Sequence, residues 1–129
     1  MNSARFISYN ANPQSNRTGD CVIRAVSKLL GYDWERTYIE LCLQGFIMAD
    51  MPNSNHVWGA YLKSKGFKRA ALPNECPDCY TVRDFCEDHP HGRYLMAISG
   101  HVVAVINGEY YDTWDSGDEC PVYYWYRED

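Results

Sequence analysis

The sequence predicts an α+β domain in which N-terminal helices pack on a C-terminal antiparallel sheet. Apolar residues recur at helical spacing in the first half of the chain, whereas strand-like runs rich in β-branched and aromatic residues fill the second half. Asn107-Gly108, a strong hairpin signal, joins two of these runs. With 129 residues, 46% of them hydrophobic, the chain has room for a single domain over residues 1–129.

The first two helices are marked by their ends. The first is predicted over residues 22–30, with Asp20 as its N-cap and Gly31 as its stop. The second is predicted to begin after Asp33 and to end at Gly45. It is expected to bury four side chains, namely Trp34, Tyr38, Leu41 and Cys42.

Two more helices and four strands follow. A helix is predicted from an Asn55 cap to Gly66. Thr81 and Asp84 resemble a capping box that opens a short helix ending before Pro90. The predicted strands cover residues 93–98, 101–106, 109–114 and 122–126.

Charge and hydropathy exclude two classes of partner. Twelve Lys and Arg against seventeen Asp and Glu give a net charge of −5, with no basic face, so we expect no nucleic-acid partner. The N-terminus lacks the apolar stretch of a signal peptide, and the longest apolar run, residues 102–106, is too short to cross a bilayer. We therefore expect a cytoplasmic protein without a membrane partner, whose six cysteines are reduced.

Cys21 is the candidate nucleophile. It directly follows the predicted N-cap of the first helix, where free backbone N–H groups and the helix dipole favour a thiolate. Gly19 permits a tight turn that brings other groups close to the sulfur. A buried structural thiol is the alternative interpretation of this position.

His101 is the candidate base. It opens a strand after Gly100, so its ring is expected at the end of the sheet, where a cleft reaches it. His56, His89 and His91 lie at a helix start or in a polar turn and are expected to be solvated. A histidine that merely ends a strand is the structural alternative.

The hairpin register supplies an orienting carboxylate. If Asn107-Gly108 is a two-residue turn, Ile106 pairs with Glu109, and His101, Asp112 and Trp114 share one face. Asp112 is then a diagonal neighbour of the imidazole and can fix its tautomer. Trp114 can cover that hydrogen bond and exclude water from it.

These residues resemble the papain-like cysteine peptidase superfamily, in the order Cys at a helix start, His at a strand start, then an acid or amide two residues before Trp. The resemblance spans residues 18–114 and also extends to small phage and bacterial proteins. It implies a minimal papain-like fold, with Cys21 as nucleophile, His101 as general acid/base and Asp112 as orienting residue. The strings that carry it are Gly19-Asp20-Cys21, Gly100-His101-Val102-Val103-Ala104-Val105 and Tyr111-Asp112-Thr113-Trp114-Asp115-Ser116.

The resemblance also implies a glutamine that completes an oxyanion hole with the Cys21 backbone N–H. At the usual spacing of six residues the chain has Ser15, with Gln14 one residue farther and Asn16 one nearer. Gln14 is the favoured donor, and Trp114 is the expected supporting residue.

A zinc site is the competing interpretation of the remaining cysteines. Cys76 and Cys79 form a CxxC pair, and Cys86 with His89 or His91 can complete four ligands. An incidental thiol pair or a reversible disulfide is the alternative, and no cofactor is favoured.

Three functional classes follow from these observations. The favoured class is a thiol hydrolase, a peptidase, amidase or deamidase, that acts on a peptide or protein through an acyl-enzyme thioester. The second is a catalytically inactive papain-like module that binds protein. The third is a zinc-stabilised interaction domain.

Overall fold

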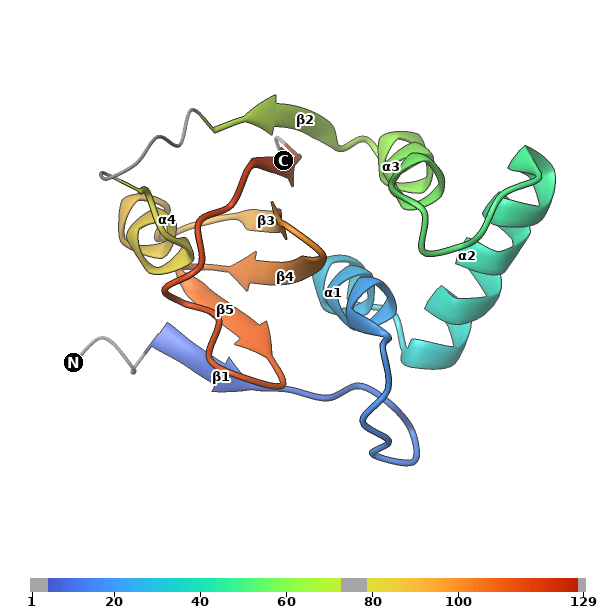
Figure 1. Ribbon diagram of the computed structural model, residues 1–129, viewed down its shortest axis with the longest axis horizontal. Coiled ribbons are helices and arrows are strands. Elements are labelled where there is room, and N and C mark those ends of the chain that lie inside the picture. The colour runs from blue at the N-terminus through green and yellow to red at the C-terminus, as the bar shows by residue number, and fades with distance from the viewer. Residues whose placement is uncertain (1–4, 73–78, 128–129) are drawn as a thin grey trace.

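The described part of the chain forms four helices and one six-stranded sheet (Figure 1). The computed structural model describes residues 5–72 and 79–127. The predicted α+β class is confirmed, and the sheet is mostly antiparallel. The helices are α1 (Cys21–Leu30), α2 (Trp34–Met48), α3 (Asn55–Ser64) and α4 (Val82–Asp88).

The first helix, α1, has its predicted ends. Gly31 follows it with a φ of 73°, a left-handed conformation that glycine adopts readily. Asp20 occupies the N-cap position, but its side chain makes no capping hydrogen bond. The carboxylate is bound elsewhere, as described with the candidate site.

The prediction that α2 ends at Gly45 is wrong. The helix continues to Met48 and ends where Ala49 adopts a left-handed conformation. Gly45 is buried, and a Cβ there would lie 2.6 Å from the carbonyl oxygen of Asp50. This glycine therefore lets the following loop pack on the helix. Of the four side chains expected to be buried, only Leu41 is; Trp34 and Cys42 are half-buried and Tyr38 is exposed.

Of the other two helices, α3 differs from prediction only at its ends, and α4 agrees with it. Ser54, not Asn55, caps α3 by accepting a hydrogen bond from the His56 N–H, and the helix ends at Ser64. The predicted capping box of α4 is confirmed, with Thr81 and Asp84 each accepting from the other's backbone.

The sheet contains two strands that the sequence did not predict. Its order is β1-β5-β4-β3-β6-β2, so a strand precedes the helices and another interrupts them. β1 pairs parallel to β5, which corrects the expectation of a wholly antiparallel sheet. The strands are β1 (Phe6–Ser8), β2 (Lys68–Ala71), β3 (Arg93–Ile98), β4 (His101–Ile106), β5 (Glu109–Asp112) and β6 (Tyr123–Tyr126).

The predicted hairpin register is confirmed. Ile106 pairs with Glu109, and Ala104 pairs with Tyr111. Asn107 and Gly108 have φ angles of 50° and 80°, as a turn that matches the twist of two antiparallel strands requires. The register places the start of β4 beside the end of β5.

Helices cover both faces of the sheet. Val102 and Ala104 pack in a cluster with α1 and α3, whereas Val103 and Val105 face a second cluster with α4. Figure 1 shows α2 on the outside, with α1 between it and the strands. None of the helices in the described ranges has the length and apolar character needed to cross a bilayer.

Candidate active site

Cys21 is the first residue of α1 and is half-buried. Because the Asp20 side chain does not cap the helix, the first N–H groups of α1 have no side-chain acceptor. These groups and the positive end of the helix dipole favour negative charge at the sulfur. The local structure therefore suits a thiolate.

His101 and Asp112 form a short hydrogen bond. His101 Nε2 lies 2.6 Å from Asp112 Oδ2, and the Asp112 side chain is only 2% exposed. Because Nε2 is engaged by the carboxylate, Nδ1 is the ring nitrogen left for the hydrogen bond between His101 and Cys21. The structure thus brings together the three residues predicted as a triad.

Three groups hold the Asp112 carboxylate. The hydroxyl of Ser116, itself fully buried, donates to Oδ2 at 2.7 Å, and the Thr113 N–H donates to Oδ1 at 2.8 Å. Arg24 Nη2 lies 3.6 Å from Oδ1. With both oxygens engaged, the carboxylate presents a fixed acceptor to His101.

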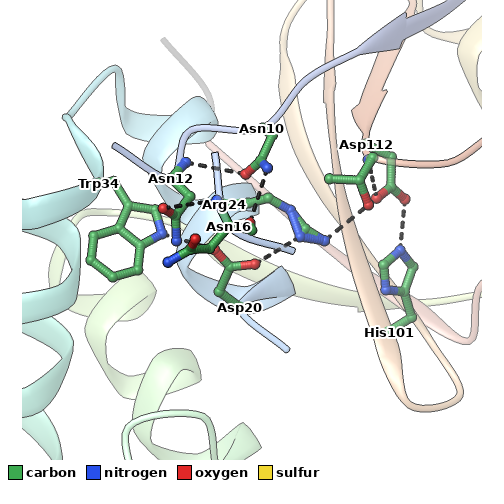
Figure 2. Close-up of polar contacts among 9 residues, drawn as sticks. Asn10, Asn12, Asn16, Asp20, Arg24, Trp34, His101 and Asp112 are labelled. Carbon is green, nitrogen blue, oxygen red and sulfur yellow. Dashed lines mark hydrogen bonds and ion pairs between the residues drawn. The ribbon is translucent and has the colours of Figure 1, made fainter. Parts of the chain in front are cut away.

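Arg24 links Asp112 to the N-terminus of α1 (Figure 2). Its Nη1 donates to Asp20 Oδ1 at 3.1 Å, and the Trp34 indole donates to the other Asp20 oxygen at 2.9 Å. Positive and negative side chains therefore alternate from Asp20 to Arg24 to Asp112. Such alternation reduces the cost of burying each charge.

The sulfur and the imidazole have opposite pKa shifts. Burial raises the pKa of Cys21, but hydrogen bonds from His101 and from the Val102 N–H outweigh it and hold that pKa below its usual value. Burial lowers the pKa of His101, but its hydrogen bonds to Asp112 and Cys21 outweigh burial and raise it to about 9. Both shifts favour a thiolate–imidazolium pair.

Trp114 covers one side of the imidazole. The two ring centroids are 5.0 Å apart, and the indole is 45% exposed. The indole therefore packs beside His101, where the predicted register places it; shielding of the hydrogen bond with Asp112 stays a prediction.

A cleft of about 540 Å³ opens beside the sulfur. Cys21 and His101 both line it, with polar side chains from Asn53 and Asn55. Gln14, the predicted oxyanion donor, is exposed and is not among the residues that line this cleft. The structure therefore does not bring Gln14 together with the triad.

The chain matches no family model, no curated protein and no solved structure.

The competing zinc ligands do not converge in the described residues. Cys76 lies outside them, and within them no group of three His, Cys, Asp or Glu is arranged to hold a metal ion. Cys86 is fully buried, and burial raises its pKa to about 12. His89 stacks on the Phe85 ring at 3.7 Å. Cys86 and His89 are thus occupied by packing around α4.

Sequence reasoning missed Arg24, Ser116 and the cleft asparagines. Asp20 and Arg24, four residues apart, are a recognisable helical ion pair. Ser116 follows Asp112 by four residues in a non-repetitive loop, so no periodic signal marks its hydroxyl. Asn53 comes from the loop between α2 and α3, whose proximity to Cys21 depends on tertiary packing.

Proposed function

We propose that this chain is a cysteine hydrolase that cleaves an amide bond in a peptide or protein. The observation that carries the proposal is that Cys21 and His101 line the same cleft, where His101 lowers the pKa of Cys21 and Cys21 raises the pKa of His101, while His101 Nε2 is held by Asp112 at 2.6 Å. The cleft is open, so a substrate can reach the sulfur and the imidazole.

The papain-like resemblance supports the same roles. That superfamily has a cysteine at a helix start, a histidine at a strand start and then an orienting residue. Here Cys21 begins α1, His101 begins β4, and Asp112, at the end of β5, binds His101. Asp112 replaces the amide usual in that superfamily. A carboxylate in this place keeps the imidazole protonated to higher pH than an amide would.

The reaction has two steps. The Cys21 thiolate forms a bond to the carbonyl carbon, the carbon–nitrogen bond breaks, and the leaving nitrogen takes a proton from His101. Water then gives a proton to His101 and its oxygen attacks the thioester, which releases the acid and regenerates the thiolate. Asp112 holds the ring in place throughout.

Stabilisation of the oxyanion is assigned to the start of α1. The Cys21 backbone N–H is in the uncapped first turn, where helix N–H groups favour negative charge. Asn53 lines the cleft beside this turn and carries an amide that can donate. It takes the place that the sequence had assigned to Gln14.

Alkylation by iodoacetamide at pH 7, read residue by residue by mass spectrometry, tests the proposal. Cys21 is expected to react at least tenfold faster than Cys42 and Cys120, which are also half-buried and serve as internal controls. His101→Ala should abolish the difference, whereas His91→Ala, at an exposed turn, should leave it. Equal reactivity of the three thiols would refute an activated nucleophile.

An inactive binding module is the second candidate, favoured by the position of Gln14 away from the cleft. Fluorescein-labelled casein and acetylated hexapeptide pools separate the two functions. Fast alkylation of Cys21 with cleavage of either probe supports the hydrolase, and fast alkylation with binding but no cleavage supports the module. We place either function in the cytoplasm, where a reducing environment keeps Cys21 a thiol.

A further inference from the structure

A second hollow adjoins the catalytic cleft. It has a volume of about 550 Å³ and shares two lining residues, Asn55 and Tyr123, with the cleft that contains Cys21. It lies between α3 and the neighbouring strands β2 and β6, and Trp125 also lines it. A substrate chain held at the sulfur can therefore continue into this hollow.

The two hollows differ in charge. Apart from His101 and the thiol, the cleft is lined by neutral side chains. The adjoining hollow contains Lys63 and His56 from α3 and Arg69 from β2, and we call it the basic groove. Within the described residues, no Asp or Glu lines either hollow, although the chain as a whole has a net charge of −5.

The cations of the basic groove are available to a ligand. Lys63 and Arg69 are exposed, and neither forms an ion pair with a described residue. The Arg69 guanidinium lies 3.9 Å from the centroid of the Tyr123 ring, so it is held at the junction of the two hollows. This contact leaves the guanidinium N–H groups free to donate to a carboxylate.

One residue of the same groove carries an unsatisfied donor. The Trp125 indole Nε1 is buried and has no hydrogen-bond partner. Buried donors without an acceptor are uncommon in folded proteins. The side chain that carries this donor, Trp125, is one of the residues that line the basic groove.

We propose that the basic groove is a subsite for a carboxylate of the substrate chain, so that the enzyme favours acidic peptides. This inference rests on the proposed hydrolase function, and it assigns the selection of charge to Lys63 and Arg69 rather than to the residues around Cys21. Because both cations are exposed, the preference over a neutral side chain should be modest, roughly three- to tenfold.

Competition for Cys21 tests the subsite without requiring turnover. The probes are acetylated hexapeptide amide pools with Glu, its neutral counterpart Gln, or Lys at each position in turn. Each pool is titrated against iodoacetamide alkylation of Cys21, at a pH where the thiol reacts. At one position, the Glu pool should protect Cys21 at a roughly three- to tenfold lower concentration than the Gln pool.

Charge reversal assigns the preference to the groove. In the double variant Lys63→Glu/Arg69→Glu, the Lys pool should protect Cys21 at the lowest concentration. The matched control Arg17→Glu/Lys28→Glu changes the net charge equally but touches neither hollow, and should keep the preference for Glu. Equal protection by Glu and Gln pools, or the same preference in both double variants, overturns the subsite.

One further comparison completes the test. Pools with a free C-terminal carboxylate are compared with the amide pools. This comparison shows whether the groove binds an internal acidic side chain or the end of the chain, and a preference for either supports the subsite. Failure of the hydrolase proposal is recognised separately, because Cys21 would then react at the rate of an ordinary thiol while the comparison of Glu and Gln still reports on the groove.

Discussion

The Arg24 guanidinium lies 3.6 Å from the Asp112 carboxylate, and neither side chain is more than 8% exposed. Arg24 is also one turn from Cys21 on the same helix, so a single cation contacts Asp112 and contributes positive potential at the Cys21 sulfur. Asp20 holds the opposite edge of the guanidinium at 3.1 Å. Arg24 is thus a positioning residue for the proposed triad.

Arg24→Gln should raise the pKa of Cys21, because it removes a positive charge that favours the thiolate. A higher pKa leaves a smaller thiolate fraction at neutral pH, so alkylation of Cys21 should slow. The variant should also lose about 3–5 kcal/mol of stability, because two buried carboxylates lose their partner. The pH dependence of alkylation and urea unfolding measure the two effects.

Arg24→Lys separates charge from structure. It keeps the positive charge but not the planar guanidinium that contacts both Asp20 and Asp112. It should therefore keep most of the lowering of the Cys21 pKa while losing stability. Arg17→Gln, at an exposed position, is the control for removing a cation from the chain. An unchanged alkylation profile in Arg24→Gln would show that Arg24 acts on stability alone.

Asp112→Asn should return the pKa of His101 from about 9 toward its ordinary value, because the ring loses its carboxylate partner. The proton resonances of the His101 ring, followed by NMR against pH, report this change directly. Asp118→Asn removes a carboxylate that is 87% exposed and should leave the titration of His101 in place. A titration near pH 9 in both variants would contradict the role of Asp112.

Alkylation of wild-type Cys21 should rise in two steps with pH. The first step lies below the ordinary thiol pKa, because the pKa of Cys21 is lowered. The second lies near pH 9, where His101 loses its proton and the unpaired thiolate becomes more nucleophilic. His101→Ala should show one step, near the ordinary thiol pKa. A single step in the wild-type protein would argue against the ion pair.

The same two shifts both stabilise the folded state, but with opposite dependence on pH. The raised pKa of His101 stabilises the folded state fully below pH 6.5, and this contribution is lost as the pH rises through about 9. The lowered pKa of Cys21 stabilises the folded state above the ordinary thiol pKa, and this contribution is lost as the pH falls through the lowered value. Urea unfolding of wild type and His101→Ala should therefore differ below pH 6.5, and the part of the difference due to His101 protonation should be lost as the pH rises through about 9.

The sequence was most informative where structure is local. The Asn107-Gly108 turn determines the β4–β5 register, and that register alone brings Asp112 to His101. The contact of Arg24 with Asp112 and the position of Asn53 in the cleft depend on tertiary packing, which no spacing in the sequence reveals. β1 and β2 were missed because they are three and four residues long and depend on pairing with β5 and β6 rather than on alternation of their own residues.

Gly45 shows how local and tertiary effects compete, and Gly45→Ala tests which is larger. Alanine favours a helix over glycine by about 1 kcal/mol, but its Cβ would lie 2.6 Å from the Asp50 carbonyl oxygen, and such overpacking costs about 1–3 kcal/mol. Because the contact is with backbone, we expect net destabilisation, measured by urea unfolding. Gly19→Ala, where a Cβ meets nothing within 4 Å, should change stability by less than about 0.5 kcal/mol. A Gly45→Ala variant as stable as wild type would mean that the loop after α2 moves away from the new Cβ at little energetic cost.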